Sequence, residues 1–311
     1  MVEPSASRRG DALAAIFGGS REQARRFVDL GRTDGPHLLL AVPSASGAMA
    51  HAAILCAYPG RTAMLLATAP KTPIDCAAVE GLVREAIRRA PELGALMIQA
   101  LLEPLRAQER RVHEAAGMRV IGTLAYLERA RNTAPPRASL PDGARVRAWH
   151  PSERALLECL LAETYIESLD CPGLSQLRPT SDILDGHLRS GTPDFSRWLI
   201  MELDGIPSGV SLVSEIPSTH CMELVYFGLA KRARGIGLGR ALLDATLERT
   251  AGESVTLACD EANVPAMRLY RSRAFRTHLR RTALVAPAAR VARSALPTTY
   301  PRRVDNAKIR A

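Results

Sequence analysis

Three glycines at alternate positions stand between a strand-like segment and a helix-like segment. They are Gly235, Gly237 and Gly239, and Arg234 and Arg240 lie beside them. Residues without a Cβ let the backbone come close to a ligand. A helix start presents unpaired N–H groups and a partial positive charge. Together with the two arginines, this pattern predicts a site for a phosphate-type anion.

Three phosphate-bearing ligands compete for this loop. A nucleoside-triphosphate loop requires Lys followed by Ser or Thr after the last glycine, and neither follows here. A dinucleotide loop requires a third glycine where Arg240 or Leu242 stands, although Asp260 has the spacing of the ribose-binding acid. That fold also requires several further strand–helix units, and too few residues follow residue 254 to form them. An acyl-coenzyme A (acyl-CoA) site is the third alternative and fits best.

The residues around the loop carry a family resemblance. Arg234-x-x-Gly237-x-Gly239 resembles the coenzyme A pyrophosphate motif of the GCN5-related N-acetyltransferase (GNAT) superfamily. The family also has an N-x-x-A-x-x-x-Y-x-x-x-G-F block after its fifth strand. This sequence matches that block at Asn263, Ala266, Tyr270, Ala274 and Phe275, with Ala274 in the place of glycine. Residues 223–229, with Glu223 at their start, resemble the fourth strand, so the resemblance covers residues 144–286.

The resemblance implies a fold and a cosubstrate. The fold is α/β, with a mixed central sheet flanked by helices and a splay between the fourth and fifth strands. Acetyl-CoA would place its pyrophosphate on the amides of residues 235–240 and its pantetheine arm on the open edge at residues 227–229, with the Leu229 N–H facing the thioester oxygen. The cofactor-binding residues implied in this way are Phe227, Leu229, Arg234, Gly235, Ile236, Gly237, Leu238, Gly239, Arg240 and Asn263.

The resemblance also implies direct attack of an amine on the thioester. Glu223 is then the base that takes the ammonium proton, and Tyr270 is the acid that protonates the leaving thiolate. Each assignment has a structural alternative. Glu223 would otherwise be a surface strand residue paired with an arginine, Tyr270 would only pack against the cofactor, and Asn263 would be a helix N-cap.

The resemblance implies that the acceptor approaches from the loop that follows the first helix of this half, at residues 163–182. Glu163, Glu167 and Asp170 are the residues predicted to hold a cationic amine, on a small molecule or on a protein. The alternative is a solvated charged face, since Glu163 and Glu167 share one side of a continued helix.

Periodicity predicts the elements that position these residues. A helix is expected from Ser152 to Tyr165, followed by a hairpin whose turn is Asp204-Gly205. A strand at residues 222–230 precedes the glycine turn, and a helix follows it to Thr250. A strand at 254–258, a helix at 264–271 and a strand at 277–285 complete this half.

The first half repeats the end of the second. Residues 110–130 align with 266–286 at an offset near 157, with one residue of slack at the start, so that His113 falls on Tyr270, Arg106 on Asn263 and Gly117 on Ala274. We predict two tandem GNAT-like domains: a degenerate copy at residues 1–131, a linker at 132–143, a catalytic domain at 144–288 and a basic, disordered tail at 289–311. The first copy lacks the glycine loop, with no glycine in residues 67–80, and is predicted not to bind acyl-CoA.

Composition limits the class of protein. The chain has 311 residues, 47% of them hydrophobic and 23% charged, which is typical of a globular protein. The six cysteines are scattered without a CxxC pair, so we expect no metal and reduced thiols. Residues 1–9 lack the apolar core of a secretory signal, and no run of about 18 apolar residues spans a membrane. A cytoplasmic protein is expected.

Two further functions remain as alternatives to the N-acetyltransferase. One is a non-catalytic module that senses or binds acyl-CoA without turnover. The other is a nucleic-acid-associated protein that uses the basic tail, where residues 290–311 carry six Lys or Arg against one Asp within a net charge of +9. The sequence does not specify the acceptor amine, the acyl chain or the oligomeric state.

Overall fold

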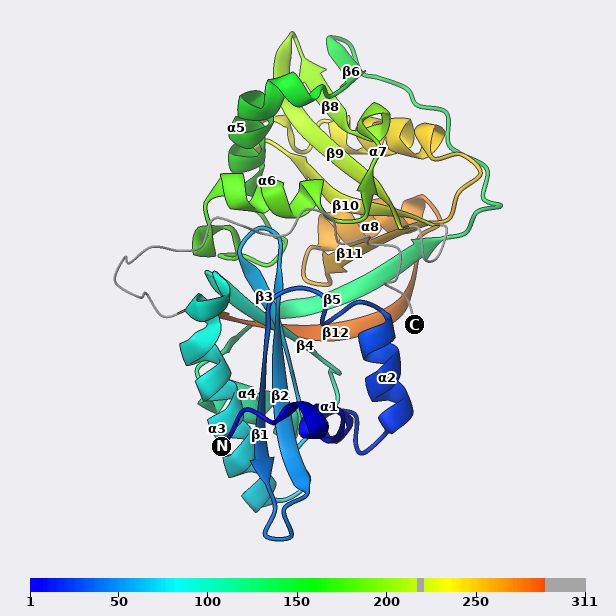
Figure 1. The fold of residues 1–311 in the computed structure, drawn as a ribbon. Coiled ribbons are helices and arrows are strands. Elements are labelled where there is room, and N and C mark those ends of the chain that lie inside the picture. Colours follow the sequence, from blue (N-terminus) through cyan, green and yellow to red (C-terminus); the bar gives the residue numbers. More distant parts are fainter. Residues whose placement is uncertain (217–220, 289–311) are drawn as a thin grey trace. The chain divides into compact units, whose positions relative to one another are not determined.

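The chain forms two compact units. The computed structural model describes residues 1–216 and 221–288, and the predicted basic tail lies outside these ranges. Unit 1 comprises residues 1–121 together with the segment that begins at residue 281, and unit 2 comprises residues 122–280. Figure 1 gives the element labels, and each unit is described below by itself.

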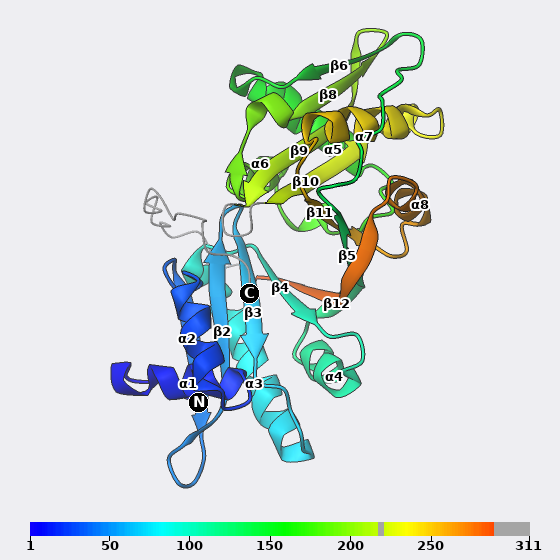
Figure 2. The ribbon, with the colours of Figure 1, turned by 90° about the vertical axis from the view of Figure 1, so that its right-hand side faces the viewer.

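Unit 1 is a mixed sheet covered by helices on both faces (Figures 1 and 2). Its strand order is β1-β2-β3-β4-β12, in which only β3 and β4 are parallel. The buried residues Val79, Leu82, Val83 and Ala86 recur at helical spacing and pack α3 against one face, while α1 packs on the other. The strands are β1 (His37–Pro43), β2 (Met49–Tyr58), β3 (Thr62–Ala67), β4 (Met97–Leu102) and β12 (Arg276–Pro287), and the helices are α1 (Arg9–Ile16), α2 (Arg21–Asp29), α3 (Pro73–Arg89) and α4 (Ala107–Ala115).

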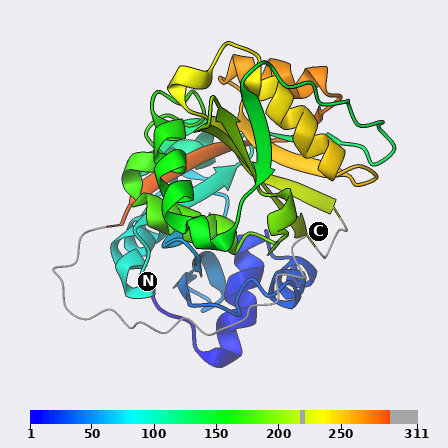
Figure 3. The same ribbon diagram turned by 90° about the horizontal axis from the view of Figure 1, so that it is seen from above.

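Unit 2 has the same layered plan, with strand order β5-β11-β10-β9-β8-β6. Along β9, Val210 and Leu212 pack under α5 and α6, whereas Ser211 bonds to Thr246 of α7 on the opposite face. Figure 3 shows α5 and α7 on the two sides of these strands. The strands are β5 (Arg119–Arg129), β6 (Ala144–Ala148), β7 (Thr192–Pro193, paired with β9), β8 (Leu199–Leu203), β9 (Ile206–Ile216), β10 (Cys221–Leu229) and β11 (Val255–Asp260), and the helices are α5 (Arg154–Tyr165), α6 (Thr180–Leu188), α7 (Leu238–Arg249) and α8 (Val264–Ser272).

The final strand of each half of the sequence pairs with strands of the other half. Residues 124–129 of β5 pair with β11 in unit 2, and residues 282–287 of β12 pair with β4 in unit 1. The predicted domains keep β5 in the first domain and β12 in the second, whereas the units divide inside both strands. Hydrophobic alternation specifies a strand but not its partner, so the sequence pattern does not predict this exchange.

The elements predicted for the second half are present with the expected types, and the mixed α/β fold class is confirmed. The hairpin turns at Asp204 and Gly205, both with positive φ, as its twist requires. The sequence predicted a loop through Asp182, whereas α6 begins at Thr180, and it did not predict the short strand β7.

The predicted correspondence between His113–Met118 and Tyr270–Phe275 appears in the backbone. At the end of α8, the N–H of Phe275 donates to the Tyr270 carbonyl and the N–H of Ala274 to the Arg271 carbonyl. The same pair of bonds ends α4, with Met118 donating to His113 and Gly117 to Glu114. Both are Schellman ends, which place their C′ residue in the left-handed region. Ala274 has φ +64° and Gly117 has φ +109°.

We expect the substitution Ala274→Gly to stabilise the protein. Alanine in the left-handed conformation is strained by about 1–2 kcal/mol, and glycine removes most of that strain. Urea unfolding followed by circular dichroism is expected to show a free energy of unfolding that is higher by about 1 kcal/mol. The reverse substitution, Gly117→Ala, is the matched control and is expected to destabilise by a similar amount. A lower stability of Ala274→Gly would contradict this reading.

Candidate active site

The glycine loop leads from β10 into α7 through two left-handed residues. Gly235 has φ +83° and Gly237 has φ +91°, a region that strains residues with a Cβ. Gly237 is the N-cap of α7 and, as a glycine, has no side chain that could cap the helix. A Cβ built at either glycine would meet nothing within 4 Å. Arg240 N already donates to Gly237 O, so the amides of Leu238 and Gly239 are the ones left for an external acceptor in the first turn of α7, which is the arrangement of an anion site.

The other loop residues divide into packing and exposed positions. A Cβ on Gly239 would lie 3.5 Å from Leu229 Cδ1, so glycine serves close packing there. Leu238 is fully buried in the core under α7. Ile236 is 56% exposed, and Arg240 is exposed on the first turn of α7, where its charge adds to the helix dipole.

β10 and β11 separate beside the loop. Their parallel ladder joins Met222 to Val255 and Glu223 to Thr256 and, in the described part of the chain, continues no further. Ala230 N donates to Ser208 O of β9 at 2.9 Å. Because successive strand residues point their N–H groups to opposite edges, the amides of Leu229 and Phe227 point toward the gap between β10 and β11. We call this the strand gap; it lies where the sequence placed the pantetheine arm.

Tyr270 of α8 lies at the strand gap and is only 5% exposed. Its ring packs edge-on against Phe227 of β10, with 6.3 Å between centroids, and against Phe275. Burial raises the pKa of Tyr270 well above its usual value, and the neighbouring Cys259 and Asp170 raise it further. The phenol therefore keeps its proton at neutral pH and can donate it.

Asp170 reaches the same place from the segment after α5. Its Oδ1 accepts a hydrogen bond from Asp260 N, at the end of β11, at 2.8 Å. Asp170 is exposed, yet the protein around it partly desolvates its carboxyl and raises the pKa of Asp170, with the Asp260 carboxylate adding to the effect. The sequence predicted Asp170 near the acceptor and did not identify Asp260, which accepts from Ala262 N at 3.0 Å and is 2% exposed.

Glu223 lies at the fork of the strand gap. It is the last residue of β10 paired with β11, opposite Thr256, and it pairs with Ser214 of β9 on its other side. The side chain is half-buried. Its assignment as the base stays a prediction, and its position at the fork is compatible with that role.

Asn263 is the N-cap of α8, and its Oδ1 accepts from Ala266 N at 3.3 Å. Asn263 therefore caps α8, as the structural alternative predicted, and its contact with a cofactor stays a prediction. Arg106, its counterpart in unit 1, occupies the N-cap position of α4 without a side-chain cap bond.

Glu163 and Glu167 lie in ion pairs with the residues before the glycine loop. Glu167 Oε1 is 2.5 Å from Lys231 Nζ, and Glu163 pairs with Arg232. Of the three acidic residues predicted to hold the amine, only Asp170 therefore reaches the strand gap. The acceptor role of Glu163 and Glu167 stays a prediction that this geometry does not favour.

The counterpart of the glycine loop in unit 1 is occupied by the chain itself. Thr72 caps α3, and Asp75 closes the capping box: its Oδ2 accepts from Thr72 N at 2.8 Å and from Lys71 N at 3.1 Å, while Asp75 N donates to Thr72 Oγ1. A carboxylate thus stands where a phosphate would bind. His113, the counterpart of Tyr270, is fully buried in unit 1.

His187 of α6 lies on the α5 side of the unit 2 sheet, with its ring 5.3 Å from that of Tyr226. Its Nε2 is buried and has no hydrogen-bond partner among the described residues. Burial, helped by the nearby Arg178 guanidinium, lowers the pKa of His187 to about 4. The folded protein therefore holds this imidazole neutral.

We expect His187 to cause part of any acid destabilisation. An unfolded histidine takes a proton near pH 6.5, whereas His187 in the folded state does so only near pH 4. Stability is thus lost as the pH falls from about 6.5 to about 4, by roughly 2–3 kcal/mol. In urea unfolding at pH 7 and pH 4.5, His187→Gln is expected to lose less stability than the parent, and the exposed His278→Gln is the control. Equal losses in all three proteins would contradict the assignment.

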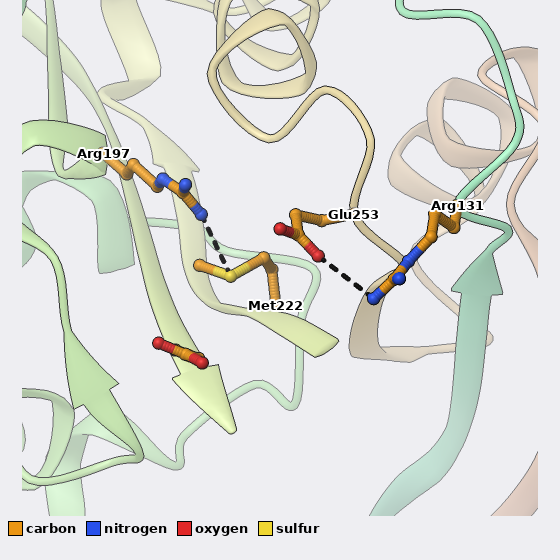
Figure 4. Close-up of a pocket in the computed structure, with 5 residues that line it drawn as sticks. Arg131, Arg197, Met222 and Glu253 are labelled. Carbon is orange, nitrogen blue, oxygen red and sulfur yellow. Dashed lines mark hydrogen bonds and ion pairs between the residues drawn. The ribbon is translucent and has the colours of Figure 1, made fainter. Parts of the chain in front are cut away.

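A separate cavity of about 400 Å³ lies in unit 2 at the start of β10, the opposite end of that strand from the glycine loop (Figure 4). Arg131 Nη2 is 3.4 Å from Glu253 Oε2, and Arg197 Nη1 is 3.1 Å from Met222 Sδ. Glu215 completes the lining, so two arginines face two carboxylates. The balanced charge selects neither an anion nor a cation, and we do not place the acceptor there.

Comparisons with known proteins agree with this fold. Residues 161–275 match the model of the acetyltransferase (GNAT) family. A GCN5-related N-acetyltransferase from Sphaerobacter thermophilus aligns with a TM-score of 0.55 at 18% identity, covering 91% of each chain. A glucosamine N-acetyltransferase region in a fungal multi-domain GH3 β-N-acetylglucosaminidase gives 0.56 at 13% identity, over 89% of this chain and 36% of that one. A tandem GNAT protein from the clavulanic acid biosynthesis pathway gives 0.48 at 16% identity, over 94% and 98%.

A search of curated protein sequences finds no match. Residues 161–275 therefore form a GNAT acetyltransferase domain, and a solved structure with that fold covers 91% of the chain.

Two further findings concern the ranges 1–216 and 221–288. In them, no group of three or more His, Cys, Asp or Glu side chains is arranged to hold a metal ion. No helix there combines the length and the apolar character needed to cross a bilayer.

Proposed function

We propose that unit 2 transfers an acetyl group from acetyl-CoA to a primary amine by direct attack of the amine. The observation that carries the proposal is the uncapped start of α7, which opens through two left-handed glycines beside the strand gap that holds Tyr270. The residues fit acetyl-CoA. The amides at the start of α7 and the Arg240 side chain can bind the diphosphate, and the open edge of β10 can bind the amide groups of the pantetheine arm.

The chain's own residues supply the proton transfers. Glu223, by our assignment, takes a proton from the acceptor ammonium, directly or through water. The amine nitrogen then bonds to the thioester carbon as the carbon–sulfur bond breaks, and a β10 amide donates to the oxygen that gains charge. Tyr270 gives its proton to the departing sulfur, and the proton shed by the new amide nitrogen restores the phenol. Asp170 holds the cationic amine at the strand gap.

We propose that unit 1 is a degenerate copy that forms a scaffold and binds no acyl-CoA. The capping box of Thr72 and Asp75 supports this, because it uses the amides that a phosphate would need. The alternative function, an acyl-CoA-binding module without turnover, requires the same loop in unit 2 and differs only in the chemistry at the strand gap.

Calorimetry and a thiol-release assay test the proposal together. Titration of the full chain with acetyl-CoA is expected to give one binding event per chain, and a panel of primary amines is expected to include acceptors that release free CoA. No heat and no thermal stabilisation at millimolar acetyl-CoA would overturn the acyl-CoA site. Binding without thiol release for every amine would instead establish the non-catalytic module.

A further inference from the structure

The side chain of Arg234 turns away from the glycine loop and toward the end of α5. Its Nη2 donates to Thr164 O at 2.8 Å, its Nη1 to Glu167 O at 3.0 Å and its Nε to Leu229 O at 3.1 Å. One guanidinium thus joins the last residue of β10 to the carbonyls at the C-terminus of α5. Helix carbonyls at this end lack intrahelical partners and carry partial negative charge, so a cation there both satisfies and stabilises them.

The neighbours of Arg234 make the same connection. Lys231 pairs with Glu167, and Arg232 pairs with Glu163. Both pairs are exposed and each is worth little by itself. The Arg234 bonds differ, because three planar N–H donors meet three fixed carbonyls, a geometry that lysine cannot reproduce. We call this set of three bonds the Arg234 clasp.

The clasped segment leads directly to the strand gap. Glu167, whose carbonyl accepts from Arg234, has φ +50° and stands three residues before Asp170. Asp170 then bonds to Asp260 N at the end of β11. The segment from Thr164 to Asp170 is therefore held at one end by the clasp and at the other by β11.

We propose that Arg234 is a positioning residue for the amine acceptor: it fixes the segment that carries Asp170, and it is not a ligand of the cofactor diphosphate. The inference rests on the proposed function of unit 2 and goes beyond it, because it gives the arginine of the R-x-x-G-x-G pattern a role on the acceptor side. It also separates the two cations of the loop. Arg240, exposed at the start of α7, is left to act on the phosphate side.

The clasp itself is tested without any ligand. Hydrogen–deuterium exchange on the full chain is compared among the parent, Arg234→Ala, Arg234→Lys and Arg240→Ala. Peptides over residues 161–171 are expected to exchange about tenfold faster or more in Arg234→Ala, because the amides of Ile166 and Ser168 bond within this segment. Arg234→Lys is expected to restore part of the protection, and Arg240→Ala to leave the segment unchanged. Unchanged exchange in Arg234→Ala would overturn the proposal.

Binding and turnover then separate the two possible roles of Arg234. In Arg234→Ala, the Kd of acetyl-CoA is expected to stay within about threefold of the parent, while kcat/KM for an amine that the panel identifies falls about tenfold or more. Arg240→Ala is expected to weaken acetyl-CoA binding instead. A loss of about tenfold or more in acetyl-CoA affinity on Arg234→Ala would make it a diphosphate ligand and overturn the proposal. If the parent protein transfers no acetyl group, the exchange experiment still decides whether the clasp exists, so the two failures are distinguishable.

Discussion

Replacing Gly237 by glutamate is expected to abolish acetyl-CoA binding while the protein stays folded. The new carboxylate would stand at the uncapped start of α7, where like charge repels the diphosphate by several kcal/mol, so affinity falls about 100-fold or more. Unit 1 offers a parallel, because Asp75 accepts from the amides of Lys71 and Thr72 at the start of α3, where we propose that no acyl-CoA binds. Calorimetry with acetyl-CoA measures the loss.

The matched control is Gly252→Glu. Gly252 has φ +83°, is exposed and has open space around a built Cβ, as Gly237 does, but it follows the far end of α7. It therefore reproduces the backbone strain and the added charge without entering the proposed site. Gly237→Ala separates strain from charge and is expected to bind acetyl-CoA far better than Gly237→Glu. Near-parental affinity in Gly237→Glu would refute the diphosphate site.

Sequence patterns predicted the parts of the site that depend on local backbone demands. The glycine turn before α7 and the helix end at Ala274 were predicted from residues close together in the chain, because a helix start and a Schellman end need only such neighbours. The tandem relation between His113 and Tyr270 was visible for the same reason, since each precedes a Schellman turn by the same spacing.

Several of the contacts that the sequence did not predict join residues far apart in the chain. The partners of Arg234 lie 67 and 70 residues away in Glu167 and Thr164. An arginine before a glycine loop can bind a phosphate or the carbonyls of a helix C-terminus equally well. The residue type alone therefore does not predict which of the two Arg234 contacts. The exchange of β5 and β12 was not predicted for a similar reason. Alternation of hydrophobic residues specifies which face of a strand is buried but not which strand it pairs with.

The second large effect is expected when Tyr270, the acid of the proposed reaction, is replaced. Tyr270→Phe is expected to lower kcat about 100-fold or more, because the departing sulfur loses its proton donor. Burial raises the pKa of Tyr270, so the phenol is protonated across the neutral range and only its hydroxyl is lost in the variant. The ring contacts with Phe227 and Phe275 remain, and acetyl-CoA affinity is expected to change little. Steady-state thiol release and calorimetry measure the two quantities separately.

Tyr58→Phe is the matched control for the lost hydroxyl. Tyr58 of unit 1 accepts a hydrogen bond from Arg32 Nη1 at 3.1 Å, in the half of the chain that we propose to be a scaffold, so its variant is expected to keep parental kcat. Because a proton donor acts only as the carbon–sulfur bond breaks, the effect of Tyr270→Phe belongs in kcat and not in cofactor binding. An unchanged kcat in Tyr270→Phe would remove the acid role and leave the residue as a wall of the strand gap. A loss confined to acetyl-CoA affinity would assign Tyr270 to binding.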